Sequence, residues 1–451
     1  MFQKVLIANR GEIAVRVISA CKDLGIRTVA VYSEADRGSL HVRYADEALC
    51  IGPPRSADSY LNIPAVISAA EITDVDAIHP GYGFLAEDPG FAEVCEVSGI
   101  KFIGPRPDVI RMMGDKAQAR RIAKKAGIPI VPGTEDPVKS VDDARKWAQE
   151  IGLPVIVKAA AGGGGRGMRV VRSLDKIEEL FHQAQHEAAI SFHSSEVYIE
   201  KFIERPRHIE FQVLGEENGK CVAIAERECS IQRRHQKLLE EGPSPSLDAA
   251  TRKRMCDIVG KALTEIGYSN AGTAEFLMDE KGDLYFIELN ARIQVEHTVT
   301  EAITGIDLVQ SQILLAAGER LDAVLPEKIE IKGHAIECRI NAENPKTFVP
   351  SAGRISQLVT PGGIGVRVDT AAYSGWFVPP YYDSLVAKLI VHGKDREQAI
   401  ARTRRALDFF SIEGIHTSIS LHQRILADPE FLAGRYDTHF IERMNSNRAA
   451  V

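Results

Sequence analysis

One ten-residue run holds the densest group of potentially reactive side chains in the sequence: Glu288-Leu-Asn-Ala-Arg-Ile-Gln-Val-Glu-His297. In an extended strand, successive side chains point to opposite faces. One face would be apolar and formed by Leu289, Ala291, Ile293 and Val295. The opposite face would carry Glu288, Asn290, Arg292, Gln294 and Glu296. Such a face can bind a metal ion, hold an anion or move a proton, although a solvated edge strand would show the same alternation.

The segment before this run predicts a β-hairpin that gives the polar face a partner. Two strand-like segments flank a glycine-containing turn at residues 279–283. Symmetric pairing places Glu275 opposite Glu288, and Met278 opposite Tyr285 nearer the turn. The Cβ atoms of the two glutamates would lie ~4.5–5.5 Å apart, where like charges destabilise a sheet. A hard divalent cation removes that repulsion, so we predict a magnesium site at these carboxylates and nearby Asn290.

The composition is that of an ordinary globular protein. A chain of 451 residues predicts two to four domains. The net charge of −7 and the isoelectric point near 6.1 argue against a nucleic-acid-binding protein. No apolar run approaches the ~18 residues of a membrane helix, and no signal-peptide pattern begins the chain, so we expect a cytoplasmic protein without a membrane partner. The seven cysteines are scattered without a CxxC pair, which argues against structural zinc and a disulfide framework.

Strand-like and helix-like segments alternate over the first quarter of the chain. This order predicts a doubly wound parallel sheet. The first turn lacks the GxGxxG pattern, so we reject a dinucleotide site. The loop His79-Pro-Gly-Tyr-Gly-Phe-Leu85 follows a strand, at the edge where open α/β sheets bind ligands. It makes Tyr82 a candidate contact, with an ordinary glycine-rich turn as the alternative.

The pattern of elements divides the chain into three domains. We expect an N-terminal α/β domain at residues 1–113, a second domain at 114–330 and a mixed α+β C-terminal domain at 331–446. Prolines near residues 129–137 mark the start of an insert in the second domain. The insert, at about 131–203, has the strands and helices of a movable lid.

A glycine-rich loop follows a strand-like segment within this insert: Ile156-Val-Lys-Ala-Ala-Ala-Gly-Gly-Gly-Gly-Arg-Gly-Met168. Glycines allow backbone N–H groups to turn toward an anion, and a lysine and an arginine add positive charge. We interpret the loop as a phosphate cradle rather than a flexible linker, because strand-like residues flank it closely. It is not a Walker A loop, since GxxxxGK[ST] is absent. The cradle would use Lys158, Gly163, Gly164, Gly165, Arg166 and Gly167.

Three further polar segments could belong to a site, and each also has an ordinary structural explanation. A strand-like segment could bind an adenine edge or simply connect two domains, and it contains Glu200, Lys201 and Ile203. The basic run Arg233-Arg-His-Gln-Lys237 could be a solvated loop or could bind anionic substrate oxygens. Arg339 on a predicted strand could be a structural ion pair or a functional cation.

Taken together, these motifs resemble those of biotin carboxylase, the ATP-grasp enzyme of the biotin-dependent carboxylases. The similarity covers essentially the whole chain. Its most specific element is the Arg-Ile-Gln-Val-Glu-His string that ends at His297, whereas the glycine loop alone is not specific. The other matching motifs are Ile7-Ala-Asn-Arg-Gly-Glu-Ile13, the His79 loop, Met113-Gly-Asp-Lys116, the basic run and Pro379-Pro-Tyr-Tyr-Asp-Ser384. The resemblance implies an N-terminal doubly wound domain, an ATP-grasp domain with a mobile lid, and a mixed α+β C-terminal domain.

The resemblance also implies a reaction and its cofactors. ATP, with Mg²⁺ or Mn²⁺, would phosphorylate bicarbonate to carboxyphosphate, and biotin N1 would then be carboxylated. The metal ligands would be Glu275, Glu288 and Asn290. The catalytic residues would be Lys237, Arg292, Glu296 as general base and Arg339 as partner of the biotin enolate. The ATP phosphates would contact Lys116, Lys158 and His208, and the adenine would contact Glu200, Lys201 and Ile203.

Further cofactor and substrate contacts follow from the same resemblance. They would come from the glycine loop and from Tyr82, Gln232, His235, Leu277, Gln294 and Val295. From the residues themselves, we expect the neighbouring Arg292 to lower the pKa of Glu296 and keep it ionised.

The expected partners depend on a missing motif. The sequence has no Ala-Met-Lys-Met-like biotinylation site. Biotin is therefore expected on a separate biotin carboxyl carrier protein, with carboxyltransferase subunits that act afterwards, and the resemblance implies a homodimer. The final carboxyl acceptor is not specified.

Two other functions compete with this interpretation. Another ATP-grasp ligase, of the carbamoyl-phosphate-synthetase type, would share the lid and the metal glutamates but would not need Arg339 or the Tyr82 loop. A non-catalytic nucleotide-binding subunit would be expected to have lost its reactive residues. All five of the most diagnostic ones are present: Lys116, Glu275, Glu288, Arg292 and Glu296.

Overall fold

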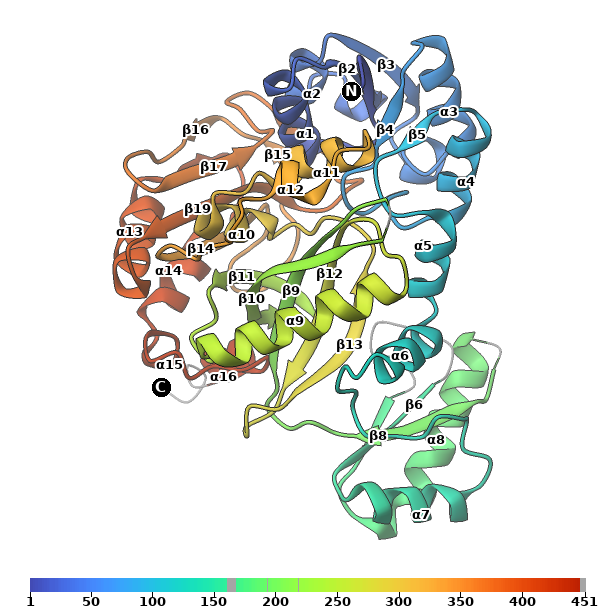
Figure 1. Ribbon diagram of the computed structural model, residues 1–451. Helices are drawn as coiled ribbons and strands as arrows, with labels where there is room; N and C mark the ends of the chain where they lie inside the picture. The colour runs from blue at the N-terminus through green and yellow to red at the C-terminus, as the bar shows by residue number, and fades with distance from the viewer. Residues whose placement is uncertain (160–167, 193, 218, 447–451) are drawn as a thin grey trace.

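The computed structural model describes residues 1–159, 168–192, 194–217 and 219–446, and all of their side chains except those of residues 116, 117, 191 and 192. An N-terminal part, a central part with a small protruding unit, and a C-terminal part succeed one another along the chain (Figure 1). The predicted multidomain α/β and α+β fold is confirmed.

A five-stranded parallel sheet, in the order β3-β2-β1-β4-β5, forms the N-terminal part. Its strands are β1 (Lys4–Ile7), β2 (Arg27–Ser33), β3 (Glu47–Gly52), β4 (Ala77–His79) and β5 (Lys101–Phe102). Its helices are α1 (Gly11–Asp23), α2 (Leu40–Tyr44), α3 (Ile63–Ile72), α4 (Pro89–Val97) and α5 (Pro107–Gly114). The strand order reverses beside β1, so the loops after β1 and β4 meet where such sheets bind ligands. There Asn9 Nδ2 donates hydrogen bonds to the carbonyls of Pro80 and Tyr82, at 2.7 and 2.8 Å.

One eight-stranded antiparallel sheet runs through the central and C-terminal parts, in the order β13-β12-β9-β10-β11-β14-β19-β17. The central strands are β9 (Arg207–Gly215), β10 (Cys221–Arg233), β11 (Gln236–Gly242), β12 (Asn270–Met278) and β13 (Leu284–Asn290). The C-terminal strands are β14 (His334–Asn341), β17 (Val366–Thr370) and β19 (Leu385–Gly393). Because β11 pairs with β14, the sheet is continuous between the two parts, and residues of both can share one site.

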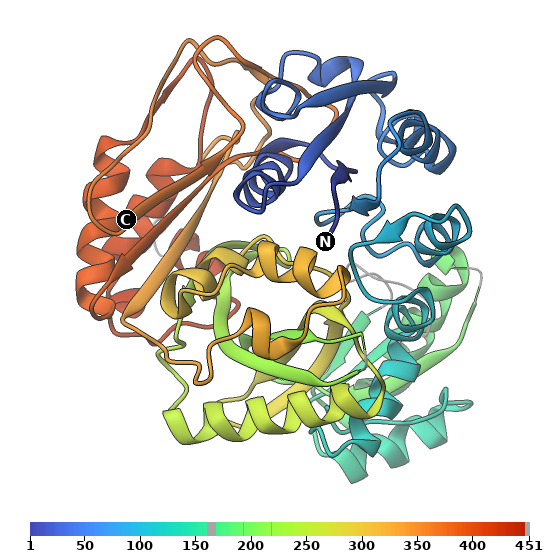
Figure 2. The same cartoon turned by 45° about the horizontal axis from the view of Figure 1, so that its top comes forward.

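Helices cover this sheet and complete the C-terminal part. The central helices are α9 (Ala249–Glu265), α10 (His297–Thr304), α11 (Leu308–Ala316) and α12 (Leu321–Val324), and the C-terminal ones are α13 (Arg396–Phe409), α14 (Ile419–Ala427), α15 (Pro429–Leu432) and α16 (Phe440–Ser446). Two small sheets pair β15 (Gly353–Arg354) with β18 (Phe377–Val378) and β16 (Gln357–Val359) with β20 (Ser411–Glu413). Figure 2 shows the N-terminal and C-terminal parts side by side above the central part. Where they meet, the Tyr382 hydroxyl donates a hydrogen bond to the Pro54 carbonyl at 2.6 Å.

The small protruding unit lies at the lower right of Figure 1, after α6 (Lys116–Lys125). It holds the antiparallel strands β6 (Val155–Ala159), β7 (Met168–Val171) and β8 (Val197–Lys201), with the helices α7 (Val141–Ile151) and α8 (Ile177–Phe192). The buried side chains of Val157, Phe181 and Ile199 give it a core of its own. A lid that moves independently needs a core of its own. The movement of residues 131–203 as a lid is a prediction.

The predicted hairpin is present, with two differences. Glu275 lies opposite Glu288 as expected, but a bulge follows Glu275 and shifts the remaining pairs, so Met278 faces Leu284 instead of Tyr285. The expectation that the polar run is one long strand is wrong, because β13 ends at Asn290 and α10 begins at His297. In the intervening turn, side chains take the place of a neighbouring strand as hydrogen-bond partners of the backbone. The Ala291 N–H donates to Glu87, and the Val295 carbonyl accepts from Lys388.

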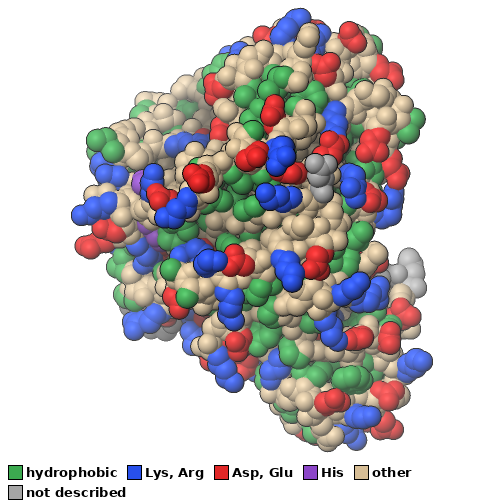
Figure 3. Space-filling model, viewed as in Figure 1, with side chains coloured by type: hydrophobic (Ala, Val, Ile, Leu, Met, Phe, Trp, Pro, Cys, Tyr) green, Lys and Arg blue, Asp and Glu red, His purple; other side chains and the backbone are tan. Residues whose placement is uncertain are grey.

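The surface drawn in Figure 3 carries charged side chains of both signs. Figure 3 shows Lys and Arg side chains interspersed with Asp and Glu. Among the described residues, no helix is both long enough and apolar enough to span a membrane.

Candidate active site

Lys237 lies at the centre of the site and contacts three carboxylates. Its Nζ lies 2.5 Å from Glu210 Oε2, 3.0 Å from Glu275 Oε1 and 2.6 Å from Glu296 Oε1. Burial alone would lower the pKa of Lys237, but the three carboxylates raise it well above its usual value. The lysine extends from β11, whereas Glu210 comes from β9 and Glu275 from β12. The predicted basic loop is therefore a tight hairpin turn between β10 and β11 that brings Lys237 over the sheet.

Glu296 is completely buried between two cations. Arg339 Nη2 donates to Glu296 Oε2 at 2.8 Å, on the side away from Lys237. Burial would raise the pKa of Glu296, but Lys237, Arg339 and Arg227 together hold it well below its usual value. Glu296 is therefore ionised, as a general base must be. The expected lowering of this pKa is confirmed. Arg292 also interacts electrostatically with Glu296, but it is not among the largest contributors, and its guanidinium binds another carboxylate: Arg292 Nε donates to Glu87 Oε2 at 2.8 Å.

The predicted metal ligands lie together beside this centre. Glu275 and Glu288 face each other across β12 and β13, and Asn290 Nδ2 donates to Glu275 Oε1 at 2.9 Å. His208 Nε2 lies 2.9 Å from the other oxygen, Glu275 Oε2. Burial would raise the pKa of Glu275, but Lys237 and His208 lower it well below its usual value. Two opposed carboxylates and amide oxygens are donors that suit a hard cation such as Mg²⁺.

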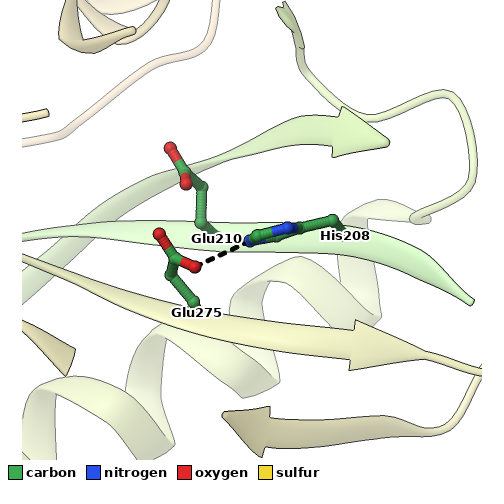
Figure 4. A group of neighbouring side chains, drawn as sticks. All are labelled: His208, Glu210 and Glu275. Carbon is green, nitrogen blue, oxygen red and sulfur yellow. Dashed lines mark ion pairs between the residues drawn. The ribbon is translucent and has the colours of Figure 1, made fainter. Parts of the chain in front are cut away.

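A third carboxylate, that of Glu210, which the sequence did not single out, belongs to the same cluster. Donor atoms of His208, Glu210 and Glu275 lie within 4.8 Å of one another. Figure 4 shows these three side chains on the same face of β9 and β12. Glu210 is completely buried and also accepts a hydrogen bond from Arg227 Nε at 2.6 Å. Its alternation with His208 along β9 was the signal that could have identified it.

Arg292 and Gln294 extend from the turn after β13. Arg292 Nη1 donates to Gln294 Oε1 at 3.1 Å, and Arg292 Nη2 donates to Asn290 Oδ1 at 3.1 Å. Gln294 Nε2 donates to Glu275 Oε1 at 3.0 Å. These contacts connect Arg292 to Glu275 through Gln294 and Asn290.

Glu200, a predicted nucleotide contact, has two basic partners. Lys158 Nζ lies 2.5 Å from Glu200 Oε2, and Arg120 also forms an ion pair with Glu200. Lys201 Nζ donates to the Gly152 and Leu153 carbonyls, at 3.0 and 2.9 Å, so its amine anchors the small unit's backbone. The predicted contacts Gly163, Gly164, Gly165, Arg166 and Gly167 lie outside the described residues, as does the side chain of Lys116.

A single cleft of about 2410 Å³ connects these groups. The predicted residues that line it are Tyr82, Lys158, Glu200, Lys201, Ile203, His208, Gln232, His235, Lys237, Glu275, Leu277, Glu288, Asn290, Arg292, Gln294, Val295 and Arg339. Glu296 has no exposed surface and is not among the lining residues, but it contacts Lys237 and Arg339, which are. The cleft can therefore hold a metal–nucleotide at one end and small anionic or planar substrates at the other.

Comparison with known proteins agrees with this geometry. Family models match at residues 1–110 (biotin carboxylase, N-terminal domain), 115–324 (carbamoyl-phosphate synthase L chain, ATP binding domain) and 337–443 (biotin carboxylase C-terminal domain). The biotin carboxylase of a Nostoc species is 55% identical over 98% of this chain and 99% of its own length. The chain belongs to the biotin carboxylase family.

Other biotin carboxylase relatives share the whole fold. A pyruvate carboxylase subunit of Methanothermobacter thermautotrophicus is 53% identical, over 98% of this chain and 90% of its own. The structure of Campylobacter jejuni biotin carboxylase has a TM-score of 0.92 at 47% identity, covering 98% of this chain and 99% of that one. The biotin carboxylase domain of a thermophilic 2-oxoglutarate carboxylase has a TM-score of 0.94 at 49% identity, covering 98% of both chains. This chain is thus a biotin carboxylase-type enzyme.

Glu337 offers a test of the electrostatics of this biotin carboxylase site. It lies opposite Glu240 in the pairing of β11 with β14, accepts a hydrogen bond from the Thr298 hydroxyl, and is completely buried. Burial raises its pKa from the usual 4.5 to about 7. Between pH 4.5 and pH 7 this carboxyl is ionised in the unfolded chain but neutral in the folded protein, so the free energy of unfolding falls as the pH rises. Above pH 7 the loss has reached its full size.

Glu337→Gln should therefore stabilise the protein more at pH 8 than at pH 5, by a difference on the order of 2 kcal/mol. The amide oxygen can still accept the Thr298 hydrogen bond. Urea unfolding of both proteins at the two pH values measures the effect. A shift that is equal at pH 5 and pH 8 would show that Glu337 is not held neutral.

Proposed function

We propose that this enzyme uses ATP to activate bicarbonate and transfers the carboxyl group to N1 of biotin on a separate carrier protein. The observation that carries the proposal is the single cleft, in which the opposed carboxylates Glu275 and Glu288 lie beside Lys237, Arg292 and Arg339. The nucleotide and the small substrates can thus bind next to each other in one cleft.

The nucleotide end would position ATP for phosphoryl transfer. Lys158 and His208 would contact its phosphates, and the strand at Glu200 and Ile203 would line the adenine. Glu275 and Glu288, with Asn290, would hold Mg²⁺, which would neutralise charge on the phosphates. Phosphoryl transfer depends mainly on such positioning and charge stabilisation.

The inner end would bind and deprotonate bicarbonate. Lys237, Arg292 and the Gln294–Val295 turn would hold its oxygens, which makes a poor nucleophile effective by placing it close to the phosphorus. Glu296 would accept the bicarbonate proton, the freed oxygen would bond to the γ-phosphorus, and ADP would leave as the β–γ bridge breaks. Since Glu296 already contacts Lys237 and Arg339, bicarbonate must enter among these contacts.

Arg339 would stabilise the enolate form of biotin during carboxylation. Its guanidinium lies at the cleft between Glu240 and Glu296, at 2.6 and 2.8 Å, and is therefore held rigidly. Tyr82 lines the same part of the cleft. A fixed cation at a developing oxyanion contributes more than a mobile one, because no reorganisation is needed.

The names of the relatives support the cofactors and partners proposed. A Hydrogenobacter thermophilus relative was solved as a biotin carboxylase domain dimer with MgADP and bicarbonate, at 51% identity. We propose the same ligands and a homodimer here, in the cytoplasm, working with a biotin carrier and carboxyltransferase subunits. The relatives include components of different carboxylases, so the final acceptor is left open.

Free biotin tests the proposal against a carbamoyl-phosphate-synthetase-type ligase. ADP release should require bicarbonate and rise when biotin is added. ADP release that is indifferent to biotin would favour the other ligase, and none at all would favour a nucleotide-binding subunit.

Arg339→Ala should reduce biotin carboxylation by about 10²-fold while the KM for ATP changes little. The physical reason is that the arginine would act on the biotin enolate, whereas the nucleotide end lies elsewhere in the cleft. Carboxybiotin formation and ATP dependence, measured on the same preparation, check this. If carboxybiotin formation and the use of ATP were impaired equally, Arg339 would not act specifically on biotin.

A further inference from the structure

Lys388 is a completely buried lysine that the proposed mechanism does not use. It lies on β19, with no exposed side-chain surface. The sheet pairs it directly with Arg339 on β14 and with Asp369 on β17. Directly opposed side chains share a face, and two opposed cations repel. A second buried cation beside Arg339 therefore needs a specific reason.

The ammonium of Lys388 holds the turn that precedes Glu296. Lys388 Nζ donates a hydrogen bond to the Val295 carbonyl at 2.9 Å. Val295 lies in the turn between β13 and α10, where the regular ladder has ended. A charge-assisted hydrogen bond is stronger than a neutral one and fixes the carbonyl's direction. The orientation of the flanking peptide groups, and hence of Gln294 and Glu296, depends on that carbonyl.

The same ammonium is tied to the N-terminal part through Glu12. Lys388 Nζ lies 3.2 Å from Glu12 Oε2, in the first turn of α1. The other oxygen of Glu12 accepts a hydrogen bond from the Tyr82 hydroxyl. One chain of contacts thus runs from Tyr82 through Glu12 and Lys388 to Val295, and it joins the N-terminal, central and C-terminal parts.

Stability alone does not account for this arrangement. A buried ion pair can often be replaced by apolar side chains of similar volume without loss of stability, because desolvation offsets the attraction between the charges. An apolar residue at position 388 could not donate to the Val295 carbonyl. We propose that Lys388 is a positioning residue for the reaction, which holds the Gln294–Glu296 turn in the geometry that binds bicarbonate, and that Glu12 links this turn to Tyr82. The inference rests on the proposed function.

Four proteins test it: Lys388→Met, Glu12→Gln, the double variant with both changes, and a control double variant, Arg252→Met with Glu226→Gln. The control removes another ion pair, 2.5 Å apart, between the largely buried Arg252 on α9 and the fully buried Glu226 on β10. The KM values for bicarbonate, ATP and free biotin, the kcat and the thermal midpoint are measured for each.

Both proteins with Lys388→Met should show a KM for bicarbonate raised by roughly tenfold or more, with the KM for ATP unchanged. Glu12→Gln keeps the Val295 contact, so it should leave the bicarbonate KM near the wild-type value and raise the KM for biotin instead. The control should alter neither. If Lys388→Met alone prevents folding, the bicarbonate KM of the double variant, in which both charges of the pair are removed, is used instead.

Two results would overturn the inference. One is a wild-type bicarbonate KM in the folded double variant. The other is a bicarbonate KM raised equally by Glu12→Gln and by the control, which would make the effect a general response to a broken pair. Wild-type turnover that is independent of bicarbonate would instead refute the proposed function.

Discussion

Glu296→Gln should lower bicarbonate-dependent ATP turnover by about 10²–10⁴-fold, the contribution expected of a general base. Glu296 is fully buried, and Lys237, Arg339 and Arg227 keep the pKa of its carboxyl well below the usual value. It is therefore ionised at every pH at which the enzyme would operate. Gln has nearly the same shape, but its single amide oxygen can accept a hydrogen bond from only one of the two cations, and the amide cannot take a proton.

The measurement compares ADP release with and without bicarbonate, together with ATP binding by calorimetry. Glu240→Gln is the matched control, since Glu240 also accepts a hydrogen bond from Arg339, at 2.6 Å. Burial raises the pKa of Glu240 well above its usual value, in contrast to that of Glu296, and Gln at this position keeps an oxygen that can accept from Arg339. Unchanged bicarbonate-dependent turnover in Glu296→Gln would exclude Glu296 as the base.

Lys237→Met should destabilise the protein by about 3–5 kcal/mol as well as abolish turnover. Removing one partner of a buried pair leaves the remaining charges uncompensated, and here the remaining charges are Glu210, Glu275 and Glu296. The folded-state pKa values of Glu275 and Glu296 are depressed, so their stabilising contribution is present above the unfolded pKa and is lost as pH falls. The deficit of the variant should therefore be largest near neutral pH and shrink on acidification.

Urea unfolding at pH 7.5 and at a series of pH values below 4.5 tests this prediction, because the stabilisation is lost between the unfolded and the folded pKa. Lys253→Met serves as the control, because the Lys253 side chain is 76% exposed and pairs with one surface carboxylate. A Lys237→Met midpoint equal to that of the wild type at pH 7.5 would mean that the three carboxylates do not depend on the lysine.

Local sequence patterns were sufficient for features made within one hairpin or one loop. The pairing of Glu275 with Glu288 follows from strand alternation and turn position, and the structure has it. The alternation of polar and apolar residues did not reveal that β13 ends at Asn290. The residues of the turn that follows alternate in the same way as those of the strand. The bulge after Glu275 was likewise invisible, since it changes pairing without changing composition.

Contacts between distant segments could not be predicted from such patterns. Glu87, which binds Arg292, lies in the N-terminal part and has no local feature that marks it. Arg227 is completely buried and donates to Glu210 and Gln212, but in the sequence it is one charge among several. The pKa of Glu296 is lowered most by Lys237, Arg339 and Arg227, which are distant in the sequence, so the local expectation named only Arg292, which contributes less.

Oxygen-18-labelled bicarbonate tests the central claim most directly, namely that the cleft lets bicarbonate attack ATP. Wild-type protein is incubated with ATP, Mg²⁺, free biotin and labelled bicarbonate, and the released phosphate is analysed by mass spectrometry. If Glu296 frees a bicarbonate oxygen to bond to the γ-phosphorus, that oxygen stays with the phosphate, and one label per turnover appears there. Unlabelled phosphate would contradict the account, because it would mean that water, not bicarbonate, attacks ATP in this cleft.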